Sequence, residues 1–398
     1  MEKFELLFKH LEEIYPSREN LVTLLKESKK LKIYLGIDPT SPEIHLGHAI
    51  ALWKLKEFQE AGHQVILLVG DFTAMIGDPS DKEATRKSLS REEVLANTAN
   101  FKKQASKILN FSGENAAKLE FNSHWLAKLT LSDLLDLAAK VTVQQLYERD
   151  MFQKRLKGGK PIGLHEFLYP LLQGYDSVAM AVDAELGGSD QTFNMLFGRT
   201  LLKSLKHKEK FVLTLPLLEG TDGQKMSKSY GNTINISNSS TDMFGKVMSL
   251  KDELIIKYFD LCTKVGSAEI KKMSDQIKSI NPMELKKKLA FEIVAIYHGK
   301  KAAQDSQKEF SRVFQEGKAP KGKRMFLPNK INADATTILE KLSMVKSKSE
   351  ARRLIEQGGV YINGRKVDSL SDTFSLETGT LVQIGKLRSV SVEIRKDT

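Results

Sequence analysis

Apolar positions near the start of the chain predict two strands joined by a helix. Residues 32–37 read KIYLGI, an apolar-rich run, and residues 64–69 read QVILLV, which is continuous enough for a buried parallel strand. Between these runs, apolar residues from Leu46 to Phe58 recur at helical spacing, and Gly62 supplies a stop. Parallel strands joined by a helix need a right-handed crossover, so the pattern predicts an α/β fold with a doubly wound, Rossmann-like parallel sheet.

The α/β pattern continues to about residue 235, which we take as the end of a first domain over 1–235. It predicts helices over 131–146 and 166–175, a glycine-rich loop over 157–163, a strand over 178–182, a tight turn into a further helix over 187–191, and a strand over 211–218.

The remainder of the chain has a different pattern. Helical, amphipathic spacing from Ser240 onwards predicts a helical domain over 236–316, and a basic stretch with Pro and Gly predicts a linker over 317–334. Residues 335–398 predict a small α+β domain with two short helices, followed by strands over 360–362, 381–384 and 390–394. Asn363-Gly364 is a strong hairpin-turn signal within it.

The composition gives the net charge of the chain and indicates the cellular compartment in which it works. The 398 residues carry a formal net charge of +11, which suits a polyanionic partner but also a solvated, lysine-rich surface. Cys262 is the single cysteine, so an intramolecular disulfide is excluded and a reducing compartment is favoured. The first residues fit neither a secretory signal nor a transit peptide, and no run approaches the roughly 20 apolar residues that cross a bilayer. We therefore expect a cytoplasmic protein.

Two distant motifs suit polyphosphate. His45-Leu46-Gly47-His48 opens a predicted helix, where unpaired N–H groups and the helix dipole attract anions, and Lys225 to Ser229 (KMSKS) form a cationic loop between glycines. A histidine alone more often caps or packs, and two histidines without a third ligand make zinc improbable. The two motifs together favour phosphate contact.

Charged and hydroxyl-bearing residues around these motifs point to ATP. Asp38 and Thr40 follow the first strand, at the sheet edge where ligands of such folds bind, and Lys82 and Arg86 lie four apart on a loop suited to a departing pyrophosphate. The residues that together would neutralise and orient ATP are Asp38, Thr40, His45, Lys82, Arg86, Lys225 and Lys228. No Ser, Cys or His is arranged as an activated nucleophile, so covalent catalysis has no support.

A third group of residues suits an amino-acid ligand. Tyr169, Gln173 and Asp176 recur at i, i+4 and i+7 and so share one helix face, and a phenol, a carboxamide and a carboxylate are unusual on a simple solvated face. Tyr34 in the first strand and Asp78 in a predicted turn would complete such a pocket, although Tyr34 alone also suits the core.

The motifs together resemble those of the bacterial tyrosyl-tRNA synthetase family, within the class I aminoacyl-tRNA synthetases. The resemblance rests on YLGIDPTSPEIHLGH, GDFTAMIGDPS, YPLLQGYD, GGSDQ and KMSKS, in that order, and covers nearly the whole chain. The tail resembles the small RNA-binding module named after a ribosomal small-subunit protein, through ARRLIEQGGVYINGRKV and LVQIGK. Leu46 replaces the family's common isoleucine, and Thr192-Phe193 stand where many relatives carry Trp-Gly.

The resemblance implies a role for each matching residue. Tyr34 and Asp176 would bind the substrate phenol; Asp78, Tyr169 and Gln173 its ammonium group; Asp38, Asp190 and Gln191 the adenylate and the carboxylate; Thr40, His45, Gly47 and His48 the phosphates; and Lys82, Arg86, Lys225 and Lys228 the leaving pyrophosphate. Apart from the resemblance, basic residues cluster on the tail and suggest an electrostatic grip on tRNA: Lys346, Lys348, Arg352, Arg353, Arg365 and Lys366.

The resemblance also implies an activity and partners. A tyrosine–tRNA ligase forms tyrosyl-adenylate from tyrosine and ATP, which brings Mg²⁺ with it, and then transfers tyrosine to tRNA; the family has no tightly bound metal and is homodimeric. Three rivals remain at this point: the related tryptophan enzyme, a non-catalytic RNA-binding protein, and a nucleotidyltransferase that passes its adenylate elsewhere. The Tyr34 and Asp176 pair and the basic tail favour the tyrosine enzyme.

Overall fold

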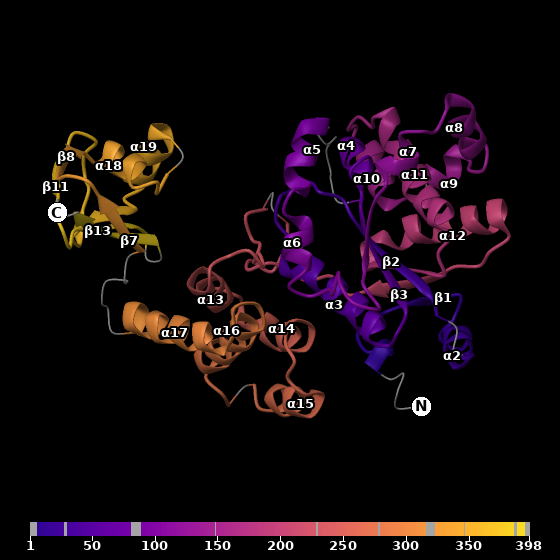
Figure 1. The fold of residues 1–398 in the computed structure, drawn as a ribbon, viewed down its shortest axis with the longest axis horizontal. Helices are drawn as coiled ribbons and strands as arrows, with labels where there is room; N and C mark the ends of the chain where they lie inside the picture. Colours follow the sequence, from indigo (N-terminus) through magenta and orange to yellow (C-terminus); the bar gives the residue numbers. More distant parts are fainter. Residues whose placement is uncertain are drawn as a thin grey trace. The chain divides into compact units, whose positions relative to one another are not determined.

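The computed structural model describes residues 6–27, 30–80, 89–147, 149–227, 230–277, 279–315, 323–345, 347–385 and 388–394 (Figure 1). The chain divides into two compact units, one formed by 1–238 with 250–274 and the other by 239–249 with 275–398. The predicted helical domain over 236–316 is therefore divided between the two units.

A six-stranded sheet forms the centre of the first unit, in the order β1-β6-β5-β2-β3-β4. Five of its strands run parallel, and β1 pairs antiparallel with β6 at one edge. The strands are β1 Ile14–Tyr15, β2 Lys32–Ile37, β3 Gln64–Val69, β4 Lys118–Phe121, β5 Ala184–Gly188 and β6 Phe211–Leu215. The strand order reverses between β2 and β5, which is the point of a doubly wound sheet where ligands bind. The predicted fold class is confirmed.

Helices cover this sheet and complete the first unit. They are α2 Arg18–Lys26, α3 Leu46–Glu60, α4 Thr73–Ile76, α5 Arg91–Thr98, α6 Phe101–Ala105, α7 Ser123–Leu126, α8 Leu131–Ala138, α9 Val143–Tyr147, α10 Asp150–Lys157, α11 Leu164–Met180, α12 Thr192–Lys206, α14 Ile255–Cys262 and α15 Ser267–Asp275, with short 3₁₀ turns at Ser189–Gln191 and Asp252–Leu254. Apolar side chains of β2, β3 and β5 are buried beneath them, as continuous apolar strands require.

Two predictions for this unit are wrong in detail. The predicted strand over 178–182 is the end of α11, which continues to Met180 and stops where Ala181 takes a left-handed conformation with φ of 48°; the strand that follows is β5. The apolar spacing there fits helix and strand alike. The predicted helix over 131–146 is two helices, because Thr130 and Thr142 each begin a new one with a side-chain hydrogen bond to the backbone three residues on.

The second unit contains a helical part and a small mixed part. The helices α13 Ser240–Met248, α16 Pro282–His298 and α17 Lys300–Phe310 pack on one another, and a π-helical turn follows at Ser311–Gln315. Ile293, Val294 and Val247 are fully buried among them. Across the described residues of the whole chain, no helix is long and apolar enough to cross a membrane.

The mixed part has a five-stranded sheet, ordered β10-β9-β12-β13-β7, beside the two-stranded pair β11-β8. Its elements are β7 Lys323–Leu327, β8 Ile331–Asp334, α18 Ala335–Lys341, α19 Lys348–Glu356, β9 Val360–Ile362, β10 Arg365–Lys366, β11 Thr373–Leu376, β12 Leu381–Ile384 and β13 Arg388–Ile394. Asn363 and Gly364 both have positive φ, 50° and 79°, so the predicted hairpin turn is confirmed.

The predicted linker over 317–334 is wrong where the structure describes it. Residues 323–327 pair in parallel with β13, and residues 331–334 pair with β11. Leu327 is buried in the same apolar cluster as Ile338 and Val392. A basic composition concealed two strands whose partners lie about 40 to 70 residues later in the chain.

Candidate active site

A pocket of about 330 Å³ opens at the carboxyl ends of β2 and β5. This volume is at the lower end of the range for small-molecule sites. The pocket is lined by most of the residues predicted from the sequence: Tyr34, Asp38, Thr40, His45, Gly47, His48, Asp78, Tyr169, Gln173, Asp176, Asp190, Gln191 and Lys225. Lys82, Arg86, Lys228 and Lys346 lie outside the described residues. The switch point of the sheet thus brings together segments that are up to 190 residues apart in sequence.

His45 and His48 form a stacked pair at the start of α3. Their ring centroids are 3.8 Å apart with an angle of 18° between the planes, and His45 occupies the N-cap position. A Cβ atom on Gly47 would lie 3.1 Å from the His45 ring, so glycine allows the ring to fold over the first turn. Within the described part of the chain, the buried Nδ1 atoms of both rings have no hydrogen-bond partner. Both nitrogens are therefore available to a ligand.

Both imidazoles are neutral at ordinary pH. Burial, followed by the charges of His48 and Lys225, holds the pKa of His45 well below its usual value. Burial, with Lys225 next, lowers the pKa of His48 to about 4, although Asp190 opposes the shift. Neutral rings with a free nitrogen can hydrogen-bond phosphate oxygens without the cost of a buried cation.

This low pKa predicts a stability change with pH. The unfolded chain takes up a proton on His48 near pH 6.5, whereas the folded protein resists it down to about pH 4, so the stability is complete above pH 6.5 and is lost as the pH falls between these values. When the pH is lowered from about 7.5 to about 5, the free energy of unfolding should fall for both proteins. We expect the fall to be about 2 kcal/mol smaller for the His48→Asn variant, which has no imidazole to protonate at this position. Urea unfolding of both proteins at each pH measures the difference. Equal losses would contradict the assignment.

The loop that carries Lys225 is tied to the histidine segment. Leu46 N donates to Ile234 O at 2.9 Å and Ile236 N donates to Ile44 O at 2.9 Å, so the chain just after the KMSKS motif pairs with the start of α3. Asn232, which is 3% exposed, accepts from Ser227 N at 2.8 Å and donates to Lys225 O at 3.1 Å. This asparagine organises the loop, and the sequence analysis missed it.

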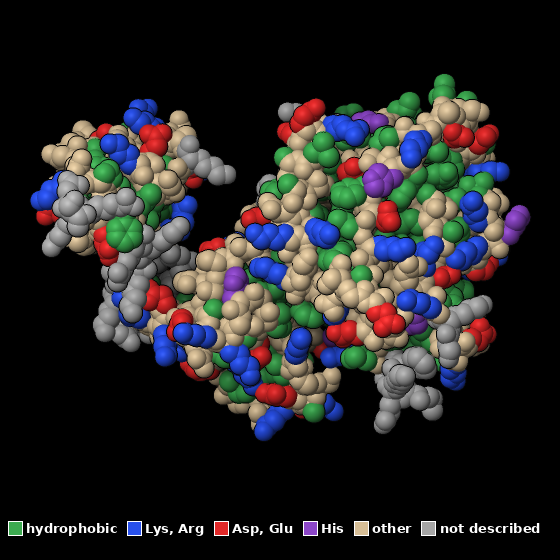
Figure 2. Space-filling view, in the orientation of Figure 1, with side chains coloured by type: hydrophobic (Ala, Val, Ile, Leu, Met, Phe, Trp, Pro, Cys, Tyr) green, Lys and Arg blue, Asp and Glu red, His purple; other side chains and the backbone are tan. Residues whose placement is uncertain are grey.

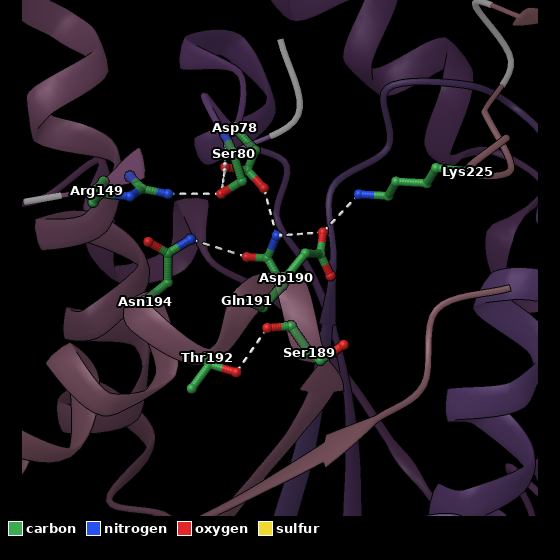
Figure 3. Close-up of polar contacts among 9 residues, drawn as sticks. All are labelled: Asp78, Ser80, Arg149, Ser189, Asp190, Gln191, Thr192, Asn194 and Lys225. Atoms are coloured by element: carbon green, nitrogen blue, oxygen red, sulfur yellow. Dashed lines mark hydrogen bonds and ion pairs between the residues drawn. The ribbon is translucent and has the colours of Figure 1, made fainter. Parts of the chain in front are cut away.

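Lys225 ends in a chain of polar contacts across the pocket (Figure 3). Its Nζ lies 2.7 Å from Asp190 Oδ2, which also accepts from Gln191 Nε2 at 3.3 Å. Gln191 Nε2 donates to Asp78 Oδ2 at 2.7 Å, and Asp78 Oδ1 accepts from the Ser80 hydroxyl at 2.7 Å. Four predicted residues are thus linked, and each carboxylate retains lone pairs for a ligand.

Arg149 supports the far end of this chain of contacts. Its Nη2 donates to Ser80 Oγ at 2.6 Å, and its guanidinium lies 5.1 Å from the centre of the Phe193 ring. Phe193 is where the sequence departs from the family's usual Trp-Gly, and the structure gives it this cation–π partner. Arg149 precedes α10 and had no motif that would have revealed it.

The other side of the pocket is lined by hydroxyl and carboxylate groups. Tyr169 donates to Asp38 Oδ2 at 2.9 Å, and Thr73 donates to Asp38 Oδ1 at 2.7 Å, so this carboxylate is held from both sides. Burial, then the charges of Asp38 and Asp78, raises the pKa of Tyr169 well above its usual value, which keeps the phenol protonated as a donor. The buried Oε1 of Gln173 has no partner among the described residues and can accept from a ligand.

Asp176 is 2% exposed and is held by two side chains that sequence reasoning missed. Trp125 Nε1 donates to its Oδ1 at 2.8 Å, and Asn122 Nδ2 donates to its Oδ2 at 3.3 Å. Burial raises the pKa of Asp176 well above its usual value, although both donors oppose the rise. Both partners follow β4, a four-residue strand without a recognisable motif.

We expect Trp125→Phe to weaken amino-acid binding. The substitution keeps the ring but removes the N–H that orients Asp176, so the KM for the amino acid should rise by about tenfold, as for a lost hydrogen bond to a charged group. Steady-state kinetics with the amino acid and ATP varied separately would measure it. A variant with unchanged KM for both would show that Trp125 does not set the position of Asp176.

The chemistry of the site is binding and charge stabilisation. A helix N-terminus, two neutral imidazoles and Lys225 suit phosphate, while Tyr34, Tyr169 and the carboxylates suit a polar amino acid. Among the described residues, no group of three or more His, Cys, Asp or Glu is placed to hold a metal ion.

A comparison with protein families shows the group of enzymes to which the chain belongs. The family model described as tRNA synthetases class I (W and Y) matches residues 26–315. The chain belongs to the class I tRNA synthetases of the tryptophan and tyrosine group. A second model, the S4 domain, matches residues 337–378, within the predicted RNA-binding tail.

Similar proteins of this synthetase group include curated relatives and solved structures. The tyrosine–tRNA ligase of Carboxydothermus hydrogenoformans is 45% identical over 99% of this chain and 98% of its own, and that of Haemophilus influenzae is 46% identical over 96% and 94%. The structure of tyrosyl-tRNA synthetase from Archaeoglobus fulgidus, complexed with L-tyrosine, superposes with a TM-score of 0.61 at 25% identity, covering 77% of this chain and 99% of that one.

The predicted tRNA-binding residues lie in the S4 part of this synthetase. Lys348, Arg352 and Arg353 are exposed on α19, and Arg365 and Lys366 are exposed on β10. A Cβ on Gly358, just after α19, would lie 2.8 Å from Lys366 Cε, so the Lys366 side chain crosses the end of that helix. These cations lie on neighbouring elements and are exposed, so a binding partner can reach them.

Proposed function

We propose that this synthetase is a tyrosine–tRNA ligase whose pocket binds tyrosine beside ATP. The observation that carries the proposal is the pairing of Tyr34 and Asp176, both buried, in the same pocket as His45, His48 and Lys225. A phenol hydroxyl both donates and accepts, and a tyrosine hydroxyl next to a carboxylate offers it one partner of each kind. Tryptophan, the other substrate of the group, has a single N–H donor and would leave one of them unsatisfied.

Tyrosine is held at both ends in this proposal. Tyr34 and Asp176 bind its phenol, while Asp78, Tyr169 and Gln173 receive its ammonium group. Gln173 Oε1, which has no hydrogen-bond partner in the described part of the chain, and the remaining lone pairs of Asp78 supply the acceptors that an ammonium group needs. Gln191 Nε2 donates to both Asp78 and Asp190, and it would turn one of these two N–H groups to the substrate carboxylate when tyrosine binds. The carboxylate then lies on the phosphate side of the pocket.

The first step joins that carboxylate to ATP. Its oxygen attacks the α-phosphorus in line, the bond to the bridging oxygen breaks, and pyrophosphate leaves with the electron pair. Thr40, His45, Gly47 and His48 would donate to the phosphates, Asp38 and Asp190 would hold the adenosine side, and Lys225 would stabilise the leaving group, with Lys82, Arg86 and Lys228. The contributions are orientation and charge stabilisation that grows in the transition state.

ATP would carry Mg²⁺ into the site, which neutralises phosphate charge when it is bound. The described residues include no cluster of three metal-binding side chains, so the fit is to a metal held mainly by phosphate.

The second step and the assembly complete the proposal. A terminal ribose hydroxyl of tRNA(Tyr) attacks the tyrosyl carbonyl and AMP leaves, with Lys346, Lys348, Arg352, Arg353, Arg365 and Lys366 gripping the tRNA.

We also propose a cytoplasmic homodimer. Its support is a set of exposed apolar side chains on neighbouring segments of the first unit, and Figure 2 shows hydrophobic groups gathered over this region: Leu131, Leu135, Val143, Leu156 and Leu164.

Charging of tRNA tests the function. The protein, ATP and total bacterial tRNA should convert labelled tyrosine into acid-precipitable counts, and labelled tryptophan should stay at background. Periodate treatment of the tRNA destroys the terminal ribose diol and should abolish the signal. Charging with tryptophan would instead assign the chain to the other enzyme of its group.

A further inference from the structure

A buried ion pair lies directly behind the hydroxyl of Tyr34. Lys210 is 0% exposed and Glu185 is 4% exposed, and the Lys210 ammonium contacts Glu185 Oε2. Lys210 Nζ also donates to Ser177 Oγ at 2.8 Å, and Ser177 Oγ lies 2.9 Å from the Tyr34 hydroxyl oxygen. Glu185 itself lines the pocket. Lys210, Glu185 and Ser177 all lie outside the motifs of the sequence.

Four elements have to meet to build this cluster. Tyr34 comes from β2, Ser177 from α11, Glu185 from β5, and Lys210 from the residue before β6. Gly198 on α12 makes room for it, because a Cβ there would lie 2.9 Å from Lys210 Nζ and 3.1 Å from Ser177 Oγ. The absence of a side chain at Gly198 therefore leaves room for the Lys210 ammonium group beside Ser177.

Stability is a weak explanation for such a pair. Taking two charges out of water costs about as much as their attraction returns, and apolar residues of similar volume are often equally stable or better. Apolar side chains would fill the space below the pocket wall without this desolvation cost. The contact of the ion pair with the group that recognises the phenol suggests a function instead.

We propose that Lys210 and Glu185, acting through Ser177, are positioning residues for tyrosine recognition by Tyr34. This inference rests on the proposed function. Lys210 can only donate, and it neutralises the Glu185 carboxylate while supplying one hydrogen bond to Ser177 Oγ. With that charge neutralised, the proton of Tyr34 stays available to the phenol oxygen of the substrate.

Loss of Lys210 alone would change which group accepts the hydrogen bond of the Tyr34 hydroxyl. A bare carboxylate at Glu185 is a far stronger acceptor than a neutral phenol, so it would draw the Tyr34 proton inward, directly or through Ser177. The phenol of tyrosine would then lose its donor, while phenylalanine, which has no phenol, would lose nothing. The selectivity for tyrosine over phenylalanine should therefore fall together with the affinity for tyrosine, and ATP binding should be unaffected.

The test is the Lys210→Met variant of the full chain in amino-acid-dependent ATP–pyrophosphate exchange. We expect the KM for tyrosine to rise by about tenfold, the KM for ATP to stay within about twofold, and the preference for tyrosine over phenylalanine to fall by about tenfold. The double variant Lys210→Met with Glu185→Gln removes the competing charge as well, and should recover most of the tyrosine KM. A folded single variant with unchanged tyrosine KM, or a double variant no better than the single one, would overturn the inference.

Two further variants separate positioning from folding. Ser177→Ala keeps the ion pair but removes the link, so it should raise the KM for tyrosine by about fivefold even if Lys210→Met does not fold; an unchanged KM would count against the inference. Lys54→Met is the matched control, because Lys54 is 2% exposed and pairs with Glu57 away from the pocket. It should lower the thermal midpoint and leave the KM for tyrosine unchanged. Absence of tyrosine-dependent exchange in the unmodified protein would contradict the proposed function itself, a result distinct from these.

Discussion

Replacement of Lys225 by alanine is expected to lower the kcat of tyrosine-dependent ATP–pyrophosphate exchange by about 100- to 1000-fold. The Lys225 ammonium lies 2.7 Å from the Asp190 carboxylate. In the reaction it would exchange this partner for the pyrophosphate, whose negative charge increases as the bond to the α-phosphorus breaks. An interaction that strengthens in the transition state affects kcat, so the KM for tyrosine should change by less than about threefold.

Lys208→Ala is the matched control for this variant. Lys208 also pairs with a carboxylate at 2.7 Å, that of Asp183, and its side chain is about as exposed as that of Lys225 (36% against 33%). It does not line the pocket, so its loss should leave kcat unchanged. Equal effects of the two substitutions would show that the loss at Lys225 reflects general charge or stability.

The second large effect is expected from removing the S4 part of the chain. A protein shortened to residues 1–315 should retain tyrosine-dependent exchange within about threefold but lose at least about 100-fold in the rate of tRNA charging. The pocket lies wholly within the first unit, whereas the exposed cations of α19 and β10 would be gone. The end at 315 matters, since β7 and β8 belong to the deleted sheet.

Charge variants test the same idea without truncation. Replacing Arg352 and Arg353 by alanine should raise the KM for tRNA and reduce the dependence of its logarithm on the logarithm of salt concentration, because each phosphate contact releases counterions. The KM for tyrosine should not move. Loss of exchange in the shortened protein would instead mean that the S4 part is needed for folding.

Local signals were sufficient for two central strands of the sheet and for one wall of the site. KIYLGI and QVILLV form β2 and β3 with the predicted limits, because strands buried on both faces must be continuously apolar. The residues after them then reach the pocket by topology, since the carboxyl ends of parallel strands share one edge. His45 and Lys225 were predictable because each sits in a sequence motif and the two motifs together favour phosphate contact.

The supporting residues could not be predicted in the same way. Trp125, Arg149 and Lys210 each act through a partner that is distant in the chain, and Asn232 lies just beyond the KMSKS motif. A single residue of this kind has no periodicity or spacing to reveal it. Lys210 illustrates the difficulty most clearly. In the sequence it is one lysine among the basic residues before β6, whereas in the fold it is fully buried against Glu185.

The most direct test of the central claim is ATP–pyrophosphate exchange with tyrosine, tryptophan and phenylalanine measured in parallel on the full chain. The arrangement of Tyr34 and Asp176 beside His45 and Lys225 predicts exchange that depends on tyrosine, with the other two amino acids at background. Exchange that prefers tryptophan would contradict the roles of Tyr34 and Asp176. Exchange with none of the three would contradict the assignment of this pocket to amino-acid activation.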